Sequence, residues 1–259
     1  MDTAVTLNES NNDVDTLAVN IAEGSQAFSF ADIDDLTIGT VDLTVGITTA
    51  SGNITVDAAG ALSVTTLNRV KVTSGGGTAI SLEGSSVTLN AGGAGTETVT
   101  NNGTGTITIS AASNDITLGH HAIGAGTGLV TLAAQSGEIL AANATATQEI
   151  DSDGSVTMTA VGIGSDTHNI EITGDGTADN TLTITSTAIN GEDIDITEMT
   201  AQFNQIDLTI GDADVDVDIE LAGVDVIDIN GTADTLTLNN MVIYHLYESL
   251  LLISFFCHN

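Results

Sequence analysis

The sequence predicts an all-β protein, a parallel β-helix (β-solenoid) with short three-residue strands. A unit of apolar, polar and apolar residues recurs along most of the chain. The segments between units are rich in Gly, Asn, Asp and Ser, which favour tight turns. Strands of sandwiches and barrels usually run to about five or six residues. Strands this short, repeated so often, instead favour coils that stack on one another.

Each unit predicts a minimal strand whose first and third residues face the interior and whose middle residue faces solvent. In chain order the units are LTI at 36–38, LTV at 43–45, ITV at 54–56, LSV at 62–64, VKV at 70–72, ISL at 80–82, VTL at 87–89, ITI at 107–109, ITL at 116–118, VTL at 130–132, VTM at 156–158, IEI at 170–172, LTI at 182–184, IDI at 194–196, IDL at 206–208 and LTL at 236–238.

The spacing of the units predicts two or three strands per coil. Ile170, Leu182, Ile194 and Ile206 begin successive units at intervals of twelve residues, and earlier units are 7 to 14 residues apart. The repeat region then makes about eight to ten coils. We divide the chain into lead-in or edge strands at 1–30, a solenoid domain at 31–240 and an atypical apolar tail at 241–259. The tail predicts either a capping helix or a non-native end.

The composition limits the possible partners. Thirty-five Asp and Glu face two Lys and Arg, a formal net charge of −33. Nucleic acids bind chiefly through Lys and Arg, so a nucleic-acid partner is not expected. The expected partners are cations, which would screen the repulsion. The apolar run in the tail is shorter than the roughly twenty residues of a transmembrane helix, and Cys257 alone excludes an intrachain disulfide.

Carboxylates replace Thr and Ser at the middle positions of the later units. Glu171 is the first, and the candidate metal ligands are Asp195, Asp207, Asp218 and Asp228. If these residues align on successive coils, they form an acidic ladder that either binds Ca²⁺ through its oxygens or remains a solvated acidic face. The repeat-in-toxin calcium motif is only faintly echoed, in GDGTADNTLTI and NGTADTLTL. No cofactor other than calcium is expected.

Catalytic residues are not evident, and the chain is not expected to be an enzyme. The only basic side chains, Arg69 and Lys71, lie in LNRVKV without a matching carboxylate, so we interpret them as surface residues. His120 and His121 are adjacent, and adjacent strand residues point to opposite faces. No serine-nucleophile or phosphate-binding glycine motif is present.

Three segments resemble a known family: GNITVDAAGALSV at 52–64, SNDITLGHHAIGAGTGLVTLAAQSGEIL at 113–140 and DGSVTMTAVGIG at 153–164. They are similar to repeats of filamentous-haemagglutinin-type exoproteins and autotransporter passengers, over roughly residues 30 to 240. The resemblance implies a right-handed parallel β-helix, a handedness that parallel crossovers also favour. It further implies an extracellular or cell-surface location, with the export signal outside this chain.

The sequence therefore favours a non-enzymatic structural or adhesive segment of a large bacterial secreted or cell-surface protein. Its partners, beyond cations, are expected to be host-cell or surface glycans or proteins. Two alternatives stay open: a calcium-stabilised solenoid of the repeat-in-toxin type, and a β-helix enzyme that acts on polysaccharides.

Overall fold

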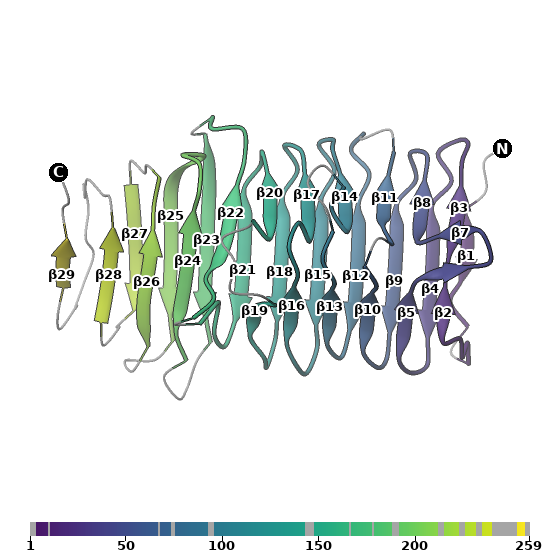
Figure 1. Cartoon of the computed structure of the whole chain (residues 1–259), viewed down its shortest axis with the longest axis horizontal. Helices are drawn as coiled ribbons and strands as arrows, with labels where there is room; N and C mark the ends of the chain where they lie inside the picture. Colours follow the sequence, from purple (N-terminus) through teal and green to yellow (C-terminus); the bar gives the residue numbers. More distant parts are fainter. Residues whose placement is uncertain are drawn as a thin grey trace.

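A computed structural model gives the structure of the protein. The residues that it describes are 4–9, 11–66, 68–73, 76–92, 96–142, 148–165, 167–177, 179–187, 192–211, 215–222, 226–231, 235–239 and 253–256, with only the backbone in the last three ranges. Across these residues the chain is all-β and has no helix. The strands stack in parallel as a β-solenoid of about eight turns. Figure 1 shows the resulting rod, with β1 near one end and β29 at the other.

Three parallel sheets form the sides of the rod. The first sheet contains β1 (Val5–Leu7), β4 (Phe28–Asp32), β9 (Ile54–Ala58), β12 (Ile80–Gly84), β15 (Ile107–Ala111), β18 (Val130–Ala134), β21 (Val156–Ala160), β23 (Asn180–Ser186), β25 (Phe203–Ile210) and β27 (Val226–Gly231). The second contains β2 (Thr16–Leu17), β5 (Leu36–Ile38), β10 (Leu62–Val64), β13 (Val87–Leu89), β16 (Ile116–Leu118) and β19 (Ile139–Ala141). The third contains β3 (Val19–Ile21), β8 (Ile47–Thr49), β11 (Val70–Val72), β14 (Val99–Asn101), β17 (Ile123–Ala125), β20 (Ile150–Ser152), β22 (Ile170–Thr173), β24 (Ile194–Glu198), β26 (Asp216–Glu220), β28 (Thr235–Asn239) and β29 (Ile253–Phe256).

The core is a set of aliphatic columns that run along the rod. In the first sheet Ile54 pairs with Ile80 and Ile80 with Ile107, so like residues stack from coil to coil. These side chains are fully buried. Full burial of each such side chain stabilises the fold by about 1.5 to 3 kcal/mol. Apart from Phe28, Phe30 and Phe203, the described core contains no aromatic side chain, as expected for a narrow interior.

Strand length differs between the sheets. Second-sheet strands from β5 onward have the expected three residues, but those of the first sheet from β4 to β21 have five, and β25 has eight. In five of these strands the fifth residue is a buried Ala or Gly, for example Ala58 and Gly84. Small residues fit at the corner where the chain turns towards the next sheet. The strands are short, as predicted, but on this face most of them have five residues rather than three.

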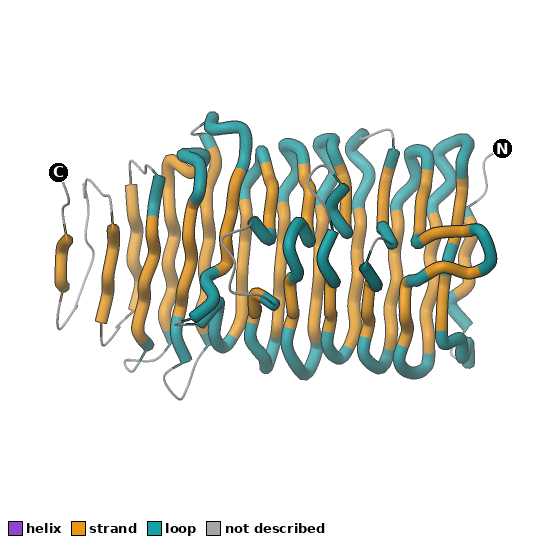
Figure 2. Tube along the Cα trace, viewed as in Figure 1, coloured by secondary structure: helices purple, strands orange, loops and turns teal. Residues whose placement is uncertain are grey.

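One predicted core unit is also wrong. The unit at 43–45 lies on an antiparallel hairpin formed by β6 (Thr40–Val41) and β7 (Thr44–Val45). Leu43 is 97% exposed and Val45 is 50% exposed. Figure 2 shows this hairpin on the outside of the rod, near its amino-terminal end. The main path of the coil continues directly from β5 to β8, so the hairpin is an excursion between two core strands.

The coils change from three strands to two along the rod. The second sheet continues beyond β19 only through isolated bridges, from Ile139 to Ile163 and from Ile163 to Ile194. Ile194 belongs to β24, which also pairs with β22 of the third sheet. The second and third sheets therefore converge on β24. The two-strand coils that follow match the twelve-residue spacing, since Leu182 pairs with Ile206 across one full coil.

The ends of the chain also add strands. β1, β2 and β3, from the predicted lead-in segment 1–30, pair with β4, β5 and β8. In the tail, residues 253–256 form strand β29 on β28, so the predicted capping helix is wrong for these residues. The other tail residues, and the question of a non-native end, lie outside the described residues. The right-handed sense of the coil stays a prediction.

Candidate functional site: acidic surfaces of the third sheet

The four predicted acidic residues form two separate pairs rather than one ladder. Asp195 pairs with Asp218 between β24 and β26 of the third sheet. Asp207 pairs with Asp228 between β25 and β27 of the first sheet. Glu171 is not in either pair, because it lies opposite Thr197. The acids therefore align only in part, as two facing pairs on different sheets, because alternate units in two-strand coils belong to different sheets.

The surroundings of the paired acids differ. Asp195 is buried, whereas Asp218 is exposed, and desolvation raises the pKa of the Asp218 carboxyl above its usual value. Asp207 accepts a hydrogen bond of 2.6 Å from Nε2 of Gln205. Of Asp228 the structure describes only the backbone. No cluster of three or more His, Cys, Asp or Glu within the described ranges could hold a metal ion. Calcium binding by these residues stays a prediction.

Glu198 is a structural carboxylate that the sequence pattern did not reveal. Its side chain is 3% exposed. Oε1 accepts hydrogen bonds from the backbone N–H groups of Gln202 (2.8 Å) and Phe203 (3.0 Å), and Oε2 accepts one from Ala222 (2.9 Å). Glu198 thus holds the turn into β25 and links it to the next coil. Nothing but its position just before a turn could have indicated this role.

Glu149 and Glu171 form a second buried acidic contact. Glu149 is 1% exposed, and its Oε2 accepts a hydrogen bond of 2.9 Å from the backbone N–H of Glu171. Burial raises the pKa of the Glu149 carboxyl to about 8, and the negative charge of Glu171 acts in the same direction. Glu149 therefore titrates near neutral pH, unlike an ordinary carboxyl group.

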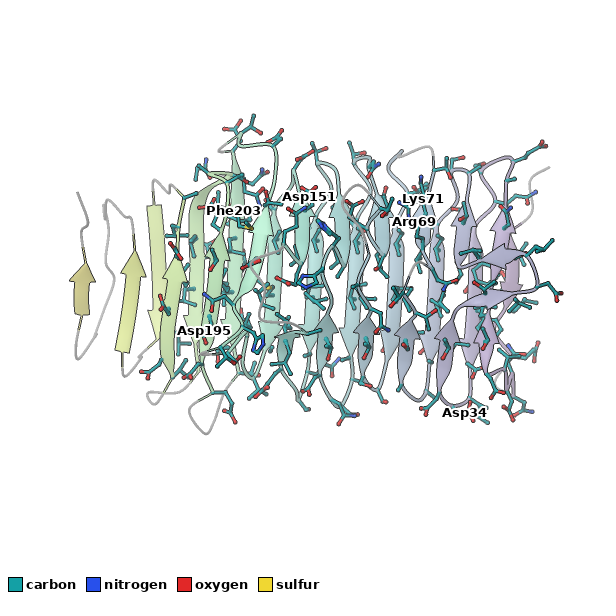
Figure 3. The ribbon with its side chains drawn as sticks, in the orientation of Figure 1. Asp34, Arg69, Lys71, Asp151, Asp195 and Phe203 are labelled. Carbon is teal, nitrogen blue, oxygen red and sulfur yellow. The ribbon has the colours of Figure 1, made fainter. Side chains whose placement is uncertain are left out.

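A polar notch of about 280 Å³ opens on the third sheet. Its lining is Glu97, Asn102, Gly124, Ala125, Gly126, Asp151 and Asp153. The residues come from β14, β17 and β20 or from their flanking turns, so the notch spans three successive coils. Figure 3 labels Asp151, which lies further along the rod from Lys71 and Arg69.

Lys71 and His121 lie near the notch. Lys71 pairs with Thr100, and Thr100 pairs with Gly124, so Lys71 is two strands from the floor of the notch. His121 adopts a positive φ of 50° in the turn before β17, and its charge opposes the upward shift in the pKa of Asp151. The notch therefore carries three carboxylates, with one imidazole near Asp151.

Comparison with known proteins finds no matching family model, no matching curated protein and no matching solved structure. The structure shows a β-solenoid repeat protein, and these comparisons give no support to the resemblance to filamentous-haemagglutinin-type proteins. Among the described residues, no helix is long and apolar enough to cross a bilayer.

Proposed function

We propose that this solenoid is a non-enzymatic structural or adhesive segment of a large secreted or cell-surface protein. The observation that carries the proposal is the unbroken stacking of the first sheet from β1 to β27. A solenoid whose coils each contact only their neighbours makes an extended rod, and such rods present long surfaces to partners. Glycans or proteins of a host cell or of another surface are the partners of an adhesive segment.

The acidic exterior supports the same role. The exposed pair Asp57 and Glu83, for example, places like charges opposite one another on the neighbouring strands β9 and β12. Opposed like charges destabilise a sheet unless cations or salt screen them. A saline exterior provides that screening, and a high net charge keeps an extended rod soluble.

Surface exposure is tested with antibodies raised against the purified solenoid and applied to intact cells that encode the chain. We expect labelling of intact cells and recovery of the chain at the surface or in the medium. Labelling that requires permeabilised cells would contradict the proposal. Adhesion is tested separately, by binding of the labelled rod to glycan and extracellular-protein arrays; absence of binding would leave only the structural role.

Calcium stabilisation is the second candidate, and the facing pair Asp195 and Asp218 is the observation that favours it. A cation between the two strands would relieve their repulsion. Ca²⁺ binding to the folded rod alone would stabilise it in a saturable manner. The ion-specific melting experiment in the Discussion tests this candidate.

A further inference from the structure

The outer face of the first sheet carries two rows of side chains, nearly all of them Ser or Thr. Buried and outward residues alternate in β15, β18, β21 and β23, so each strand presents two equivalent residues outwards. The strand register aligns the first of these residues as Thr108, Thr131, Thr157 and Thr183, and the second as Ser110, Ala133, Thr159 and Thr185. We call these two rows the hydroxyl strip.

The hydroxyl strip is regular in space although its residues are unevenly spaced in sequence. Neighbouring members of a row are 23 or 26 residues apart. The turns take up the difference, because the four strands pair without any shift of register. Neighbouring strands lie about 4.8 Å apart, and two residues span about 6.6 Å along a strand. The two rows therefore form a lattice with these two repeats.

The hydroxyl strip is uncharged within a chain of net charge −33. The strands β15, β18, β21 and β23 contain no Asp, Glu, Lys or Arg. Acids appear on the strands at either side, as Glu83 on β12 and Asp207 on β25. A cationic partner would be attracted to those acidic surfaces instead, and an anionic partner would be repelled by the rod as a whole. The strip therefore fits an uncharged partner.

The side chains of the hydroxyl strip are held in place before any partner binds. Thr157, for example, lies between Val156 and Met158, which are both fully buried in the core. Threonine is branched at Cβ, which restricts its χ1 angle. The four strands lie side by side along the middle of the rod (Figure 1). A rigid array of this kind loses little conformational freedom when it binds a rigid surface.

We propose that the hydroxyl strip binds ice. A face of an ice crystal is an uncharged lattice of hydrogen-bonding oxygen atoms, with repeats close to the two repeats of the strip. A single hydroxyl gains little from ice, because it exchanges one hydrogen bond to water for another. A rigid lattice of matching spacing engages many ordered water molecules at once. This inference does not depend on the cellular location proposed above.

Ice fits the strip better than a glycan does. Sites for small organic ligands are lined largely by apolar and aromatic side chains with a few polar groups that fix orientation. The four strands of the strip contain no aromatic residue on which a sugar ring could stack. They offer one kind of contact, repeated at fixed spacing, and such repetition matches a crystalline partner.

The test is the partition of the purified full chain into slowly growing ice, with inhibition of ice recrystallisation as a second readout. We expect the wild type to enter the ice and to slow recrystallisation. Thr157→Lys places a long charged side chain in the middle of the strip. It should lower both readouts about tenfold or more, because it breaks the hydrogen bonds of several neighbouring positions.

Thr48→Lys is the matched control, since it makes the same substitution at an outward position of β8 on the third sheet. Its neighbours there are Asn20 and Lys71, so no row of hydroxyl groups is interrupted. We expect this variant to partition into ice as the wild type does. Thermal melts confirm that each variant is folded. If Thr157→Lys does not fold, Thr131→Lys replaces it and decides by the same comparison.

Three results would overturn the proposal. Exclusion of the wild type from ice would show that the strip does not bind it. An equal loss in Thr48→Lys and Thr157→Lys would show that the strip is not the binding face. Retention of the wild type on insoluble cellulose or chitin, lost in Thr157→Lys and without adsorption to ice, would show a glycan-binding face instead. The labelling of intact cells described above is independent of all three results.

Discussion

The side chain of Glu149 accepts a hydrogen bond of 2.9 Å from the backbone N–H of Glu171. The buried Glu149 carboxyl group therefore contacts the start of β22 in the next coil. Burial and the charge of Glu171 raise the pKa of Glu149 to about 8. When the pKa of an acid is higher in the folded state, the folded protein binds more protons than the unfolded chain at any pH between the two pKa values. Its contribution to stability is therefore complete below the unfolded value of 4.5 and is lost as the pH rises through about 8.

The first prediction concerns Glu149→Gln, which keeps the hydrogen-bond acceptor and removes the titration. Between pH 5 and 8, the free energy of unfolding of the wild type should fall relative to that of the variant by up to about 1.4 kcal/mol per pH unit. Denaturant unfolding at a series of pH values measures this difference. Glu83→Gln, at an exposed site, is the control. Its free energy of unfolding should vary with pH in the same way as that of the wild type. Parallel curves for Glu149→Gln would show that Glu149 does not titrate in this range.

The second prediction concerns the buried Glu198 carboxylate. Glu198→Ala leaves the N–H groups of Gln202, Phe203 and Ala222 without their acceptor. The loss should cost about 3 kcal/mol or more, because unsatisfied buried donors retain their desolvation penalty. Hydrogen exchange should quicken first at these three amides. The exposed Glu220→Ala is the control, and an equal effect of both variants would contradict the proposed role.

The third prediction separates backbone strain from steric clash in three glycines. Gly46 has a φ of +63°, and a Cβ there would lie 2.2 Å from the backbone O of Arg69; Gly176 has a φ of +76° with open space around it; Gly76 has open space and no positive φ. Gly176→Ala should cost about 1 kcal/mol from the left-handed backbone alone. Gly46→Ala should cost several times more, and Gly76→Ala should be near neutral. Thermal melts rank the three variants by melting temperature. Equal melting temperatures for Gly46→Ala and Gly176→Ala would exclude the steric clash at Gly46.

The fourth prediction tests the facing acids Asp195 and Asp218. Asp218→Asn should raise the melting temperature at low ionic strength, by the equivalent of about 0.2 to 1 kcal/mol, because it removes one of two opposed like charges. Added NaCl should shrink this difference by screening. For a solvated acidic face, CaCl₂ at matched ionic strength should give the same wild-type midpoint as NaCl. A saturable rise specific to Ca²⁺, lost in Asp218→Asn, would establish the calcium-stabilised alternative.

Two units with the same pattern, one buried and one exposed, show what a three-residue pattern does not encode. LTI at 36–38 and LTV at 43–45 have the same pattern, yet Leu36 is fully buried and Leu43 is exposed. The difference arises because Gly39 and Gly46 are joined by a hydrogen bond of 2.8 Å that closes the hairpin base and lets the coil bypass it. A pattern of three residues contains no information about such a bypass.

The notch and the acidic pairs could not be predicted for a related reason. Glu97, Gly124 and Asp151 are far apart in sequence and belong to three different coils. Which residues meet depends on the number of residues in each coil, and the connections between second and third sheets vary in length. The sequence indicates the four aspartates as acidic residues at the middle positions of the strands. Which of them face one another depends on the change from three to two strands per coil.

By itself, the sequence determined the all-β class, the parallel stacking and nearly all of the described core columns, because strand periodicity and turn chemistry are local properties of neighbouring residues. Only the tertiary structure decided the register between coils, and with it the facing acids, the buried Glu149 and Glu198, and the notch at Gly124. Register depends on the length of each coil and on the packing of its corners, which join residues some twenty to thirty positions apart. Contacts at that separation are set by the folded coil as a whole, and no short stretch of sequence encodes them.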